Sequence, residues 1–260
     1  MKASSPKPCR LLIDEPTEGA WNMALDEALL ESAAANGQCT LRFYRWIEPT
    51  LSLGYFQHHK DRQSHKDSLS CTMVRRSTGG GAILHDRELT YSFILPTAQS
   101  LALAHDVCDA KSLYLAIHEG LITALSFFGL STRLCEQSSG LCAREEPFLC
   151  FQRRTLGDVL LGKSKIAGSA QRRRGNNRGA ILQHGSILLG TSVAAPQLPG
   201  IEQLTGVRID PHELARRLIA VLADRLRLTL DDGQPTAKEQ ALSKELVKNK
   251  FGYTGWTASR

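Results

Sequence analysis

The chain has 260 residues, of which 42% are hydrophobic and 22% are charged, and 32 Lys and Arg against 26 Asp and Glu give a formal net charge of +6. These proportions are those of a globular protein with a substantial core, and they exclude a largely disordered or collagen-like chain. No run approaches the roughly 18 apolar residues that a membrane helix needs, and the first residues lack the apolar core of a signal peptide. We therefore expect a cytoplasmic protein without a membrane partner, whose charge favours acidic partners.

Patterning in the first hundred residues predicts one helix followed by several strands. Residues 20–37 place apolar side chains at helical spacing and end in Asn36 and Gly37, which are typical of a helix stop. Segments 39–46 and 50–56 alternate as strands do, and the Pro-containing turn between them favours a hairpin. Further strands are expected over 71–76 and within 81–96, where two strands join at Asp86 and Arg87.

The segment RRSTGGGAILHD, residues 75–86, contains three consecutive glycines. Because glycine has no side chain, a ligand can lie against its backbone, so this loop is a candidate binding element. A phosphate-binding P-loop continues with Lys and leads into a helix, whereas no Lys follows Gly79, Gly80 and Gly81 and the next segment looks extended. The pattern therefore disfavours a nucleotide loop of that kind.

Patterning after residue 100 predicts more strands and then helices. The expected elements are a helix over 109–130, a strand over 131–135, a long loop over 136–154, two strands joined by a tight turn over 157–173, a strand over 178–190, and two amphipathic helices within 210–230 and 236–260 that end in an exposed tail. This order predicts an α+β fold around one sheet.

The cysteines are odd in number and include no C-x-x-C pair, which fits neither a disulfide framework nor a zinc finger. We expect free thiols in a reducing compartment and no metal site. Cys150 has the most reactive surroundings, because Arg153 and Arg154 follow it and nearby positive charge stabilises a thiolate. A buried, inert thiol is the competing interpretation. The seven cysteines are Cys9, Cys39, Cys71, Cys108, Cys135, Cys142 and Cys150.

Two lysines and two histidines are further candidates for chemistry. Lys163 and Lys165 lie in GKSKIAGSA and point the same way if that segment is a strand, so one of them could hold a substrate carbonyl or phosphate. His85 and His184 each follow an apolar strand, which could mark the ends of parallel strands, and either could be a general base. Solvated lysines and structural histidines are the alternatives.

Basic side chains concentrate in residues 151–179, where Asp158 is the one acid. The pattern is typical either of a solvated loop or of a surface for an acidic partner. An RNA-binding module that uses QRRRGNNR is a third reading, but no aromatic residues are interleaved with that run as base stacking would favour. We therefore expect no nucleic-acid partner.

Five segments, in order along the chain, resemble the superfamily of lipoate-protein ligases, lipoyl-carrier octanoyltransferases and biotin ligases. They are WNMALDEALL, LRFYRWIEPTLSLGYFQ, VRRSTGGGAILHDRELTYSF, GKSKIAGSAQRRR and GAILQHGSILL. The resemblance implies the α+β fold of those catalytic domains, with a mixed, largely antiparallel central sheet flanked by helices. It also implies a single catalytic domain over 1–260, with a matched core at about 10–190 and a helical C-terminal part at about 205–260.

The resemblance also implies which residues form the site. EEPFLCFQ matches the P-x-x-C-F context of the nucleophile in the cysteine-dependent, Bacillus-type octanoyltransferases, which makes Cys150 the nucleophile and puts Lys165 at the centre of the site. The loop glycines would lie against an eight-carbon acyl chain, and the N–H groups of residues 168–170 would stabilise an oxyanion. The implied substrate-binding residues are Arg76, Gly79, Gly80, Gly81, His85, Gly168, Ser169, Ala170 and His184.

The implied activity is transfer of octanoate from octanoyl-acyl carrier protein, through a Cys150 thioester, to the lysine of a lipoyl domain or of the glycine-cleavage H protein. Neither ATP nor a metal would be needed, and we expect a monomer. One alternative is an ATP-dependent lipoate ligase, in which Lys165 holds the phosphate of an acyl-adenylate and Cys150 is incidental. Such ligases usually carry an extra C-terminal domain, for which the residues after the last matched strand are few. A second alternative is an amidotransferase that moves octanoyl or lipoyl groups between carrier domains.

Overall fold

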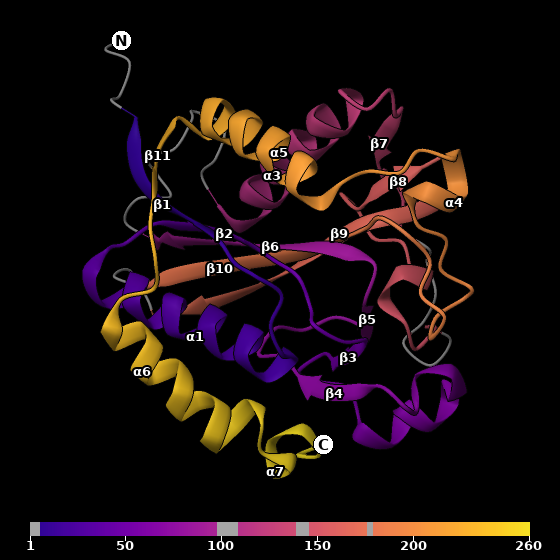
Figure 1. The fold of residues 1–260 in the computed structure, drawn as a ribbon, viewed down its shortest axis with the longest axis horizontal. Coiled ribbons are helices and arrows are strands. Elements are labelled where there is room, and N and C mark those ends of the chain that lie inside the picture. Colours follow the sequence, from indigo (N-terminus) through magenta and orange to yellow (C-terminus); the bar gives the residue numbers. More distant parts are fainter. Residues whose placement is uncertain (1–5, 98–108, 139–145, 176–178) are drawn as a thin grey trace.

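Two β-sheets form the centre of the computed structural model, which describes residues 6–97, 109–138, 146–175 and 179–260 (Figure 1). The large sheet has the strand order β11-β1-β2-β6-β10-β9-β8-β7, and the small sheet has the order β4-β3-β5. The strands are β1 (Lys7–Ile13), β2 (Thr40–Tyr44), β3 (Thr50–Leu53), β4 (Thr72–Arg75), β5 (Ile83–His85), β6 (Glu88–Pro96), β7 (Thr132–Leu134), β8 (Val159–Leu161), β9 (Ser164–Arg174), β10 (Ala180–Leu188) and β11 (Leu228–Asp232).

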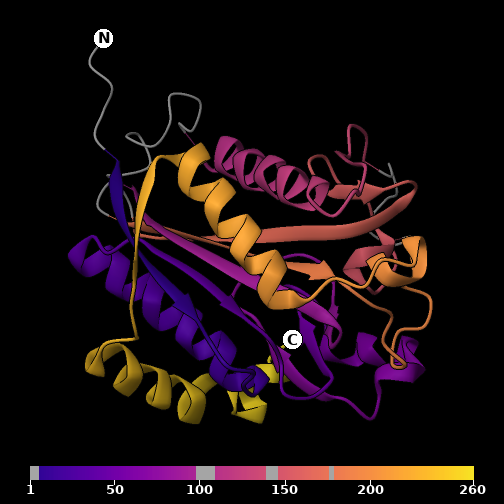
Figure 2. The same ribbon diagram turned by 45° about the horizontal axis from the view of Figure 1, so that its top comes forward.

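Helices cover both faces of the large sheet. In Figures 1 and 2, α3 and α5 lie together on one face, and α1 and α6 lie on the other. The α-helices are α1 (Gly19–Asn36), α3 (Ala110–Ser126), α4 (Ile201–Thr205), α5 (Pro211–Leu226), α6 (Ala237–Leu246) and α7 (Thr254–Thr257). Shorter helical turns span His59–Ser64, Lys66–Ser68, Cys150–Gln152 and Val247–Phe251. No helix in these described stretches is long and apolar enough to cross a membrane.

The pairing pattern of the large sheet confirms the predicted fold class. Among the described strands, β1 pairs in parallel with β11 and β2, and every other neighbouring pair of this sheet is antiparallel. The sheet is therefore mixed and largely antiparallel, with helices on both sides.

Strand β6 shows how the sequence separates core from site. Leu89, Tyr91 and Phe93 join the core that packs under α3 and α5. Because successive side chains of a strand point to opposite faces, Thr90 and Ser92 face the other way, where Ser92 donates to Asp26 of α1. The polar side chains of the central strand are thus gathered on the face that carries α1.

The expected hairpin between residues 39–46 and 50–56 is wrong. Strand β2 pairs with β1 and β6 of the large sheet, whereas β3 pairs with β4 and β5 of the small one. Every residue of β2 is buried, so this strand needs a neighbour at each edge. One neighbour is β1, whose sequence KPCRLLI contains a proline and too little alternation to predict a strand.

The C-terminal part differs from its helical expectation in two ways. Helix α5 ends where Arg227 adopts a left-handed φ of 54°, and the following residues form β11 alongside β1. Most of the final residues are exposed as expected, but Thr257 is buried and Trp256 is half-buried. The buried Arg75 guanidinium donates to Thr257 O at 2.9 Å, and the Trp256 indole donates to Arg75 O. The last residues therefore support β4, which leads into the glycine loop.

Candidate functional site

The cysteine segment is attached directly to the glycine loop. Ala82 and Leu149 form a parallel bridge, and the Cys150 N–H donates to Ala82 O at 2.7 Å. Cys150 then begins a short 3-10 turn, so its side chain projects from a fixed backbone. The structure thus brings together two segments that lie about seventy positions apart in the chain and that the sequence suggested for one site.

Lys165 lies beside this cysteine. Its Nζ is 3.7 Å from Cys150 Sγ and 2.9 Å from Asp158 Oδ2. Burial lowers the pKa of Lys165, but interactions with Cys150 and Asp158 outweigh burial, so the pKa is raised and the ammonium stays charged. A fixed ammonium at this distance stabilises negative charge on the sulfur or on an oxygen of a bound acyl group. The companion Lys163 does not share this position, because it lies exposed in the turn before β9.

Asp158 is a site residue that sequence reasoning missed. It is buried, and its Oδ2 accepts hydrogen bonds from the Thr155 backbone and hydroxyl, while its Oδ1 accepts one from the Tyr114 hydroxyl. These bonds fix the carboxylate that holds Lys165. The signal was present in the sequence, since Asp158 is the one acid in a basic segment.

Arg76 supports the glycine loop from behind. Its guanidinium donates to Ser52 O, Gly79 O and Gly81 O at 2.7–2.9 Å. Burial lowers the pKa of Arg76 to about 10, against the opposing effect of Cys150. This arginine therefore fixes the backbone on which substrate would lie, although it also lines part of the cavity described below.

The loop glycines differ in what they allow. Gly80 has a φ of 92°, a conformation that other residues rarely adopt. A Cβ on Gly81 would lie 3.1 Å from Cys150 Cα, whereas a Cβ on Gly79 would meet only Phe56 at 3.8 Å. Backbone conformation at Gly80 and close approach at Gly81 therefore explain two of the three missing side chains.

His85 and His184 come together without lying at the ends of parallel strands. His85 closes β5 of the small sheet, and His184 lies in the middle of β10 of the large one. Both imidazoles are buried and use both ring nitrogens, His85 with Ser52 and Glu88 and His184 with Thr78 and Asp26. Burial lowers the pKa of His85 despite Glu88. With both nitrogens engaged, neither histidine is free to serve as the general base considered from the sequence.

A third histidine, His118 of α3, was missed entirely. Its Nδ1 lies 2.6 Å from Gly157 O, which can only accept, so Nδ1 donates and Nε2 accepts from the Ser169 hydroxyl at 2.6 Å. Ser169 is also 2.5 Å from the Tyr91 hydroxyl. Burial lowers the pKa of His118 to about 4, against the raising effects of Gly157 and Asp158, so this imidazole is neutral and orients Ser169.

Cys150 lies where two cavities meet. We call the first the outer cleft; it has a volume of about 910 Å³, and its walls include Phe56, Phe148, Asp158 and Lys165. The second, the inner cavity, has walls that include Met23, Tyr44, Ile83 and Phe151, together with the predicted residues Arg76, Gly79, His85, Gly168, Ala170 and His184. Cys150, Gly80 and Ser169 line both.

The inner cavity is narrow and mainly apolar. Its volume is about 40 Å³, room for only a few water molecules. An acyl chain that extends from Cys150 therefore enters only if the lining side chains shift. The outer cleft is wider, and its polar walls suit a flexible carrier arm or an approaching amine.

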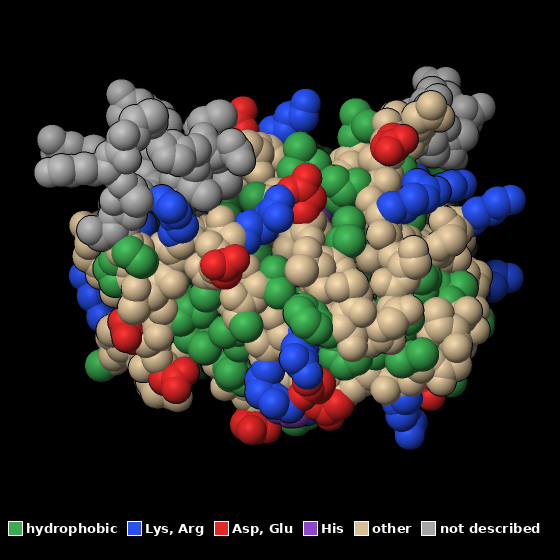
Figure 3. Space-filling model, turned by 90° about the horizontal axis from the view of Figure 1, so that it is seen from above, with side chains coloured by type: hydrophobic (Ala, Val, Ile, Leu, Met, Phe, Trp, Pro, Cys, Tyr) green, Lys and Arg blue, Asp and Glu red, His purple; other side chains and the backbone are tan. Residues whose placement is uncertain are grey.

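The basic segment is partly neutralised by acids from other parts of the chain. Arg153 pairs with Glu146, and Arg174 pairs with Glu31 of α1. Arg154, Lys163 and Arg173 are exposed and make no ion pair with the described residues. Figure 3 shows several Lys and Arg side chains at the end of the molecule that carries β7 and β8. Arg178, Cys108 and Cys142 lie outside the described residues.

No group of three or more His, Cys, Asp and Glu side chains in the described stretches could hold a metal ion.

Comparisons with known proteins find similar chains of two kinds, transferases and ligases. Residues 18–219 match the family model described as lipoyl protein ligase A/B catalytic domain. The chain is 33% identical to octanoyltransferase LipM of Carboxydothermus hydrogenoformans over 264 residues, which cover 92% of this chain and 94% of that protein. It is 39% identical to octanoyltransferase LipM of Anoxybacillus flavithermus over 270 residues, which cover 93% and 94% of the two chains.

Two similar solved structures are described as lipoate-protein ligases. One is a putative lipoate protein ligase from T. acidophilum with bound lipoic acid, with a TM-score of 0.77, 25% identity, and coverage of 96% of this chain and 99% of that chain. Another is a lipoate-protein ligase A bound with ATP, with a TM-score of 0.76, 26% identity, and coverage of 96% and 98%.

Proposed function

The chain belongs to the lipoyl protein ligase A/B catalytic-domain family, and from this premise we propose that it transfers octanoate from octanoyl-acyl carrier protein, through a thioester on Cys150, to a lysine of a lipoyl domain or of the glycine-cleavage H protein. The family membership confirms the resemblance carried by the five segments. Together with the LipM relatives, the matched catalytic domain makes the chain an acyltransferase enzyme. The donor, the acceptor and the covalent step belong to the proposal.

One observation carries the proposal: Cys150 lies at the junction of the two cavities, with Lys165 Nζ 3.7 Å from its sulfur. A nucleophile there can receive an acyl group from the outer cleft and direct its hydrocarbon chain into the inner cavity. The fixed ammonium gives this one thiol an electrostatic setting suited to attack.

In the first step, the Cys150 thiolate attacks the carbonyl carbon of the donor thioester. The new C–S bond forms, the C–S bond to the carrier arm breaks, and the released carrier thiolate takes up a proton. We propose that the Lys165 ammonium stabilises the oxyanion, with an N–H group among residues 168–170 as the second donor that the resemblance implies; the Ser169 N–H is hydrogen-bonded to the Tyr114 hydroxyl and would exchange that partner for the oxyanion. Each such donor is typically worth about 2.7–4 kcal/mol of transition-state stabilisation.

In the second step, the neutral amine of the acceptor lysine attacks the acyl-enzyme, the C–N bond of an amide forms as the C–S bond to Cys150 breaks, and the proton lost from the nitrogen passes to solvent in the outer cleft. Cys150 leaves as a thiolate beside Lys165, so the ammonium that assists attack also assists departure. The acceptor amine has a reference pKa of about 10.4 and must lose its proton before it attacks. Replacing a thioester by an amide is downhill, so we propose that the transfer uses neither ATP nor a metal.

An ATP-dependent ligase is the second candidate, favoured by the similarity to the ATP-bound lipoate-protein ligase A. In such an enzyme Lys165 would bind the phosphate of an acyl-adenylate, and the thiol of Cys150 would be dispensable. The cysteine beside the lysine is the feature that favours the transferase instead.

An acceptor assay separates the two candidates. The purified chain is mixed with a lipoyl domain and either octanoyl-acyl carrier protein without ATP or octanoate with ATP, and the domain is weighed intact. We expect octanoylation in the first mixture, and loss of it in Cys150→Ser. Octanoylation only in the second mixture, unaffected by Cys150→Ser, would establish the ligase. An octanoylated H protein as donor tests the amidotransferase.

A further inference from the structure

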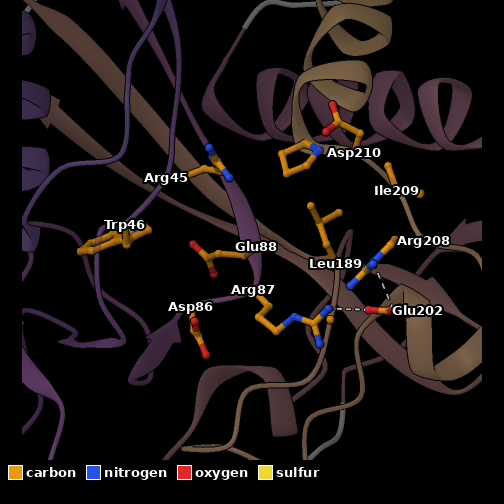
Figure 4. Close-up of a pocket in the computed structure, with 12 residues that line it drawn as sticks. Arg45, Trp46, Asp86, Arg87, Glu88, Leu189, Glu202, Arg208, Ile209 and Asp210 are labelled. Carbon is orange, nitrogen blue, oxygen red and sulfur yellow. Dashed lines mark hydrogen bonds and ion pairs between the residues drawn. The ribbon is translucent and has the colours of Figure 1, made fainter.

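Two features of the described chain lie outside the proposed chemistry. The first is a hollow of about 480 Å³ between the start of β6 and the start of α5 (Figure 4). Arg87 and Arg208 point toward Glu202 there and form ion pairs with it, so these charges already have a partner. The second is a pair of buried cysteines, Cys9 and Cys39, whose sulfur atoms lie 3.0 Å apart. Among the five cysteines that the structure describes, they are the two whose thiols contact each other.

Neighbouring strands place the two cysteines side by side. Strands β1 and β2 pair in parallel, with Arg10 opposite Thr40. The residues before these, Cys9 and Cys39, are therefore neighbours too, and the Arg10 N–H donates to Cys39 O at 3.0 Å. Both side chains belong to the core under α3 and α5, so they point to the same face of the sheet. Paired strands lie about 4.8 Å apart, which is within the Cα–Cα range of about 4.4–6.8 Å that a disulfide can span.

The two thiols form a short chain of hydrogen bonds. Cys39 donates to Cys9 Sγ, and the Cys9 thiol donates to Arg10 O at 3.8 Å. The contact with Cys9 and burial raise the pKa of Cys39 well above its usual value, so this thiol stays protonated. Each cysteine is only 1% exposed, and the structure holds both as free thiols. Exchange with a dissolved reagent is therefore slow in the folded chain, because the thiolate is the reacting form and a reagent needs access to it.

We propose that Cys9 and Cys39 are a reversible disulfide site, at which exchange with a low-molecular-weight disulfide such as oxidised glutathione links β1 to β2. The inference does not depend on the proposed acyl transfer. Two S–H bonds of the chain break and one Sγ–Sγ bond forms, while the S–S bond of the oxidant breaks. Both protons and the two electrons pass to the two glutathione thiols released, so the exchange balances without another reactant.

The ring that this bond closes contains the whole of α1. Residues 9–39 include Gly19–Asn36, the helix that carries Asp26 and Glu27 toward the candidate site. A cross-link between the two ends of this segment removes conformational freedom from the unfolded chain. The disulfide therefore stabilises the fold, and by the same thermodynamic cycle the fold favours formation of the disulfide.

The test compares disulfide formation in the folded and the unfolded chain. The full chain carrying Cys150→Ser, which removes the reactive thiol of the candidate site, is refolded in a series of glutathione buffers or kept in urea in the same buffers. Refolding lets the buried thiols reach equilibrium. The samples are acid-quenched, alkylated, weighed intact and digested to locate the bond. We expect a Cys9–Cys39 disulfide whose equilibrium constant of formation is at least about tenfold larger in the folded chain than in urea.

Cys9→Ala and Cys39→Ala, each added to the same chain, are the matched controls, because each removes one thiol of the pair. We expect oxidation to raise the unfolding temperature of the parent chain by at least about 5 °C and to leave that of either variant unchanged. If one variant does not fold, the other provides the same comparison. Equal equilibrium constants in the folded and unfolded parent, or a folded parent whose Cys9 and Cys39 are both alkylated in the most oxidising buffer, would overturn the proposal. So would an oxidised parent that unfolds at the temperature of the reduced one.

Discussion

Three side chains define the candidate site at the scale of single residues: Cys150, Lys165 and Asp158. The sequence could predict the first two, because each lies in a motif that resembles a known family. Asp158 stands out in the sequence as the one acid of a basic segment, but its partner became known only when the fold placed it 2.9 Å from Lys165 Nζ. His118 was hidden for the same reason, since its partners Gly157 and Ser169 are about forty and fifty positions away.

Replacing Lys165 should slow acylation of Cys150 by more than any loss of folding stability would explain. We expect Lys165→Met to slow acylation of Cys150 by about 10²–10³-fold, because it removes the fixed positive charge at the reacting atoms. The exposed neighbour gives a matched control: Lys163→Met should acylate at the wild-type rate. Single-turnover acylation rates, with urea unfolding of both variants, test this. Equal rates for the two variants would refute the role of Lys165.

His118 makes stability depend on pH. Burial holds its folded pKa at about 4, below the unfolded value of about 6.5, so the stabilising contribution is fully present above pH 6.5 and is lost as the pH falls towards 4. The expected loss between pH 7.5 and pH 5 is about 2 kcal/mol. Urea unfolding at the two pH values measures it. Because His118→Gln does not titrate, it should lose about 2 kcal/mol less over that interval than the wild type.

At the scale of elements, backbone conformation and close backbone contacts explain why the loop needs glycine at positions 80 and 81. A bulky substitution at Gly80 would be uninformative about an acyl chain, since its φ of 92° already disfavours any side chain. Gly79 and Gly81 can be compared instead, because neither has a positive φ and only Gly81 is packed against Cys150.

We expect Gly79→Ala to fold and to acylate normally, and Gly81→Ala to slow acylation by about 10–10²-fold through displacement of Cys150. The same intact-mass assay, with thermal unfolding as a control for folding, measures the difference. Normal acylation of a folded Gly81→Ala variant would mean that contact between this glycine and the cysteine segment does not position the nucleophile.

Elements were predictable where local pattern and burial agree. The α1 helix ends as expected, with Gly37 in a left-handed conformation, and the strands around the glycine loop follow their alternation. Strand β1 and strand β11 were not predictable, because they complete each other at the sheet edge and neither carries a strong pattern alone. The assignment of β2 and β3 to different sheets depends on such distant partners too.

At the scale of the whole molecule, the C-terminal residues support the site from outside. Lys250 pairs with Glu27 of α1, and both contact Ser77 beside the glycine loop. Arg75 is bound by Thr257 O from the same region. Residues near the C-terminus thus support the glycine loop through their contacts with β4 and with Ser77. The sequence alone could not predict these contacts, because they join residues far apart in the chain.

Removing residues 254–260 should therefore destabilise the fold. We expect a loss of about 2–4 kcal/mol, because the buried Arg75 loses both the acceptor Thr257 O for its guanidinium and the Trp256 indole that donates to its carbonyl oxygen. Urea unfolding of the shortened chain measures the loss, and Ser259→Ala, at an exposed position, is the control. Unchanged stability of the shortened chain would show that these contacts contribute nothing.

Cys150 lies between the outer cleft and the inner cavity, and the central claim is that this cysteine carries the acyl group during transfer. The most direct measurement mixes the purified chain with octanoyl-acyl carrier protein, without ATP or acceptor, and weighs it intact. We predict one octanoyl adduct that hydroxylamine removes and that is absent in Cys150→Ala. An adduct that persists in Cys150→Ala, or no adduct on the folded wild-type chain, would contradict the claim.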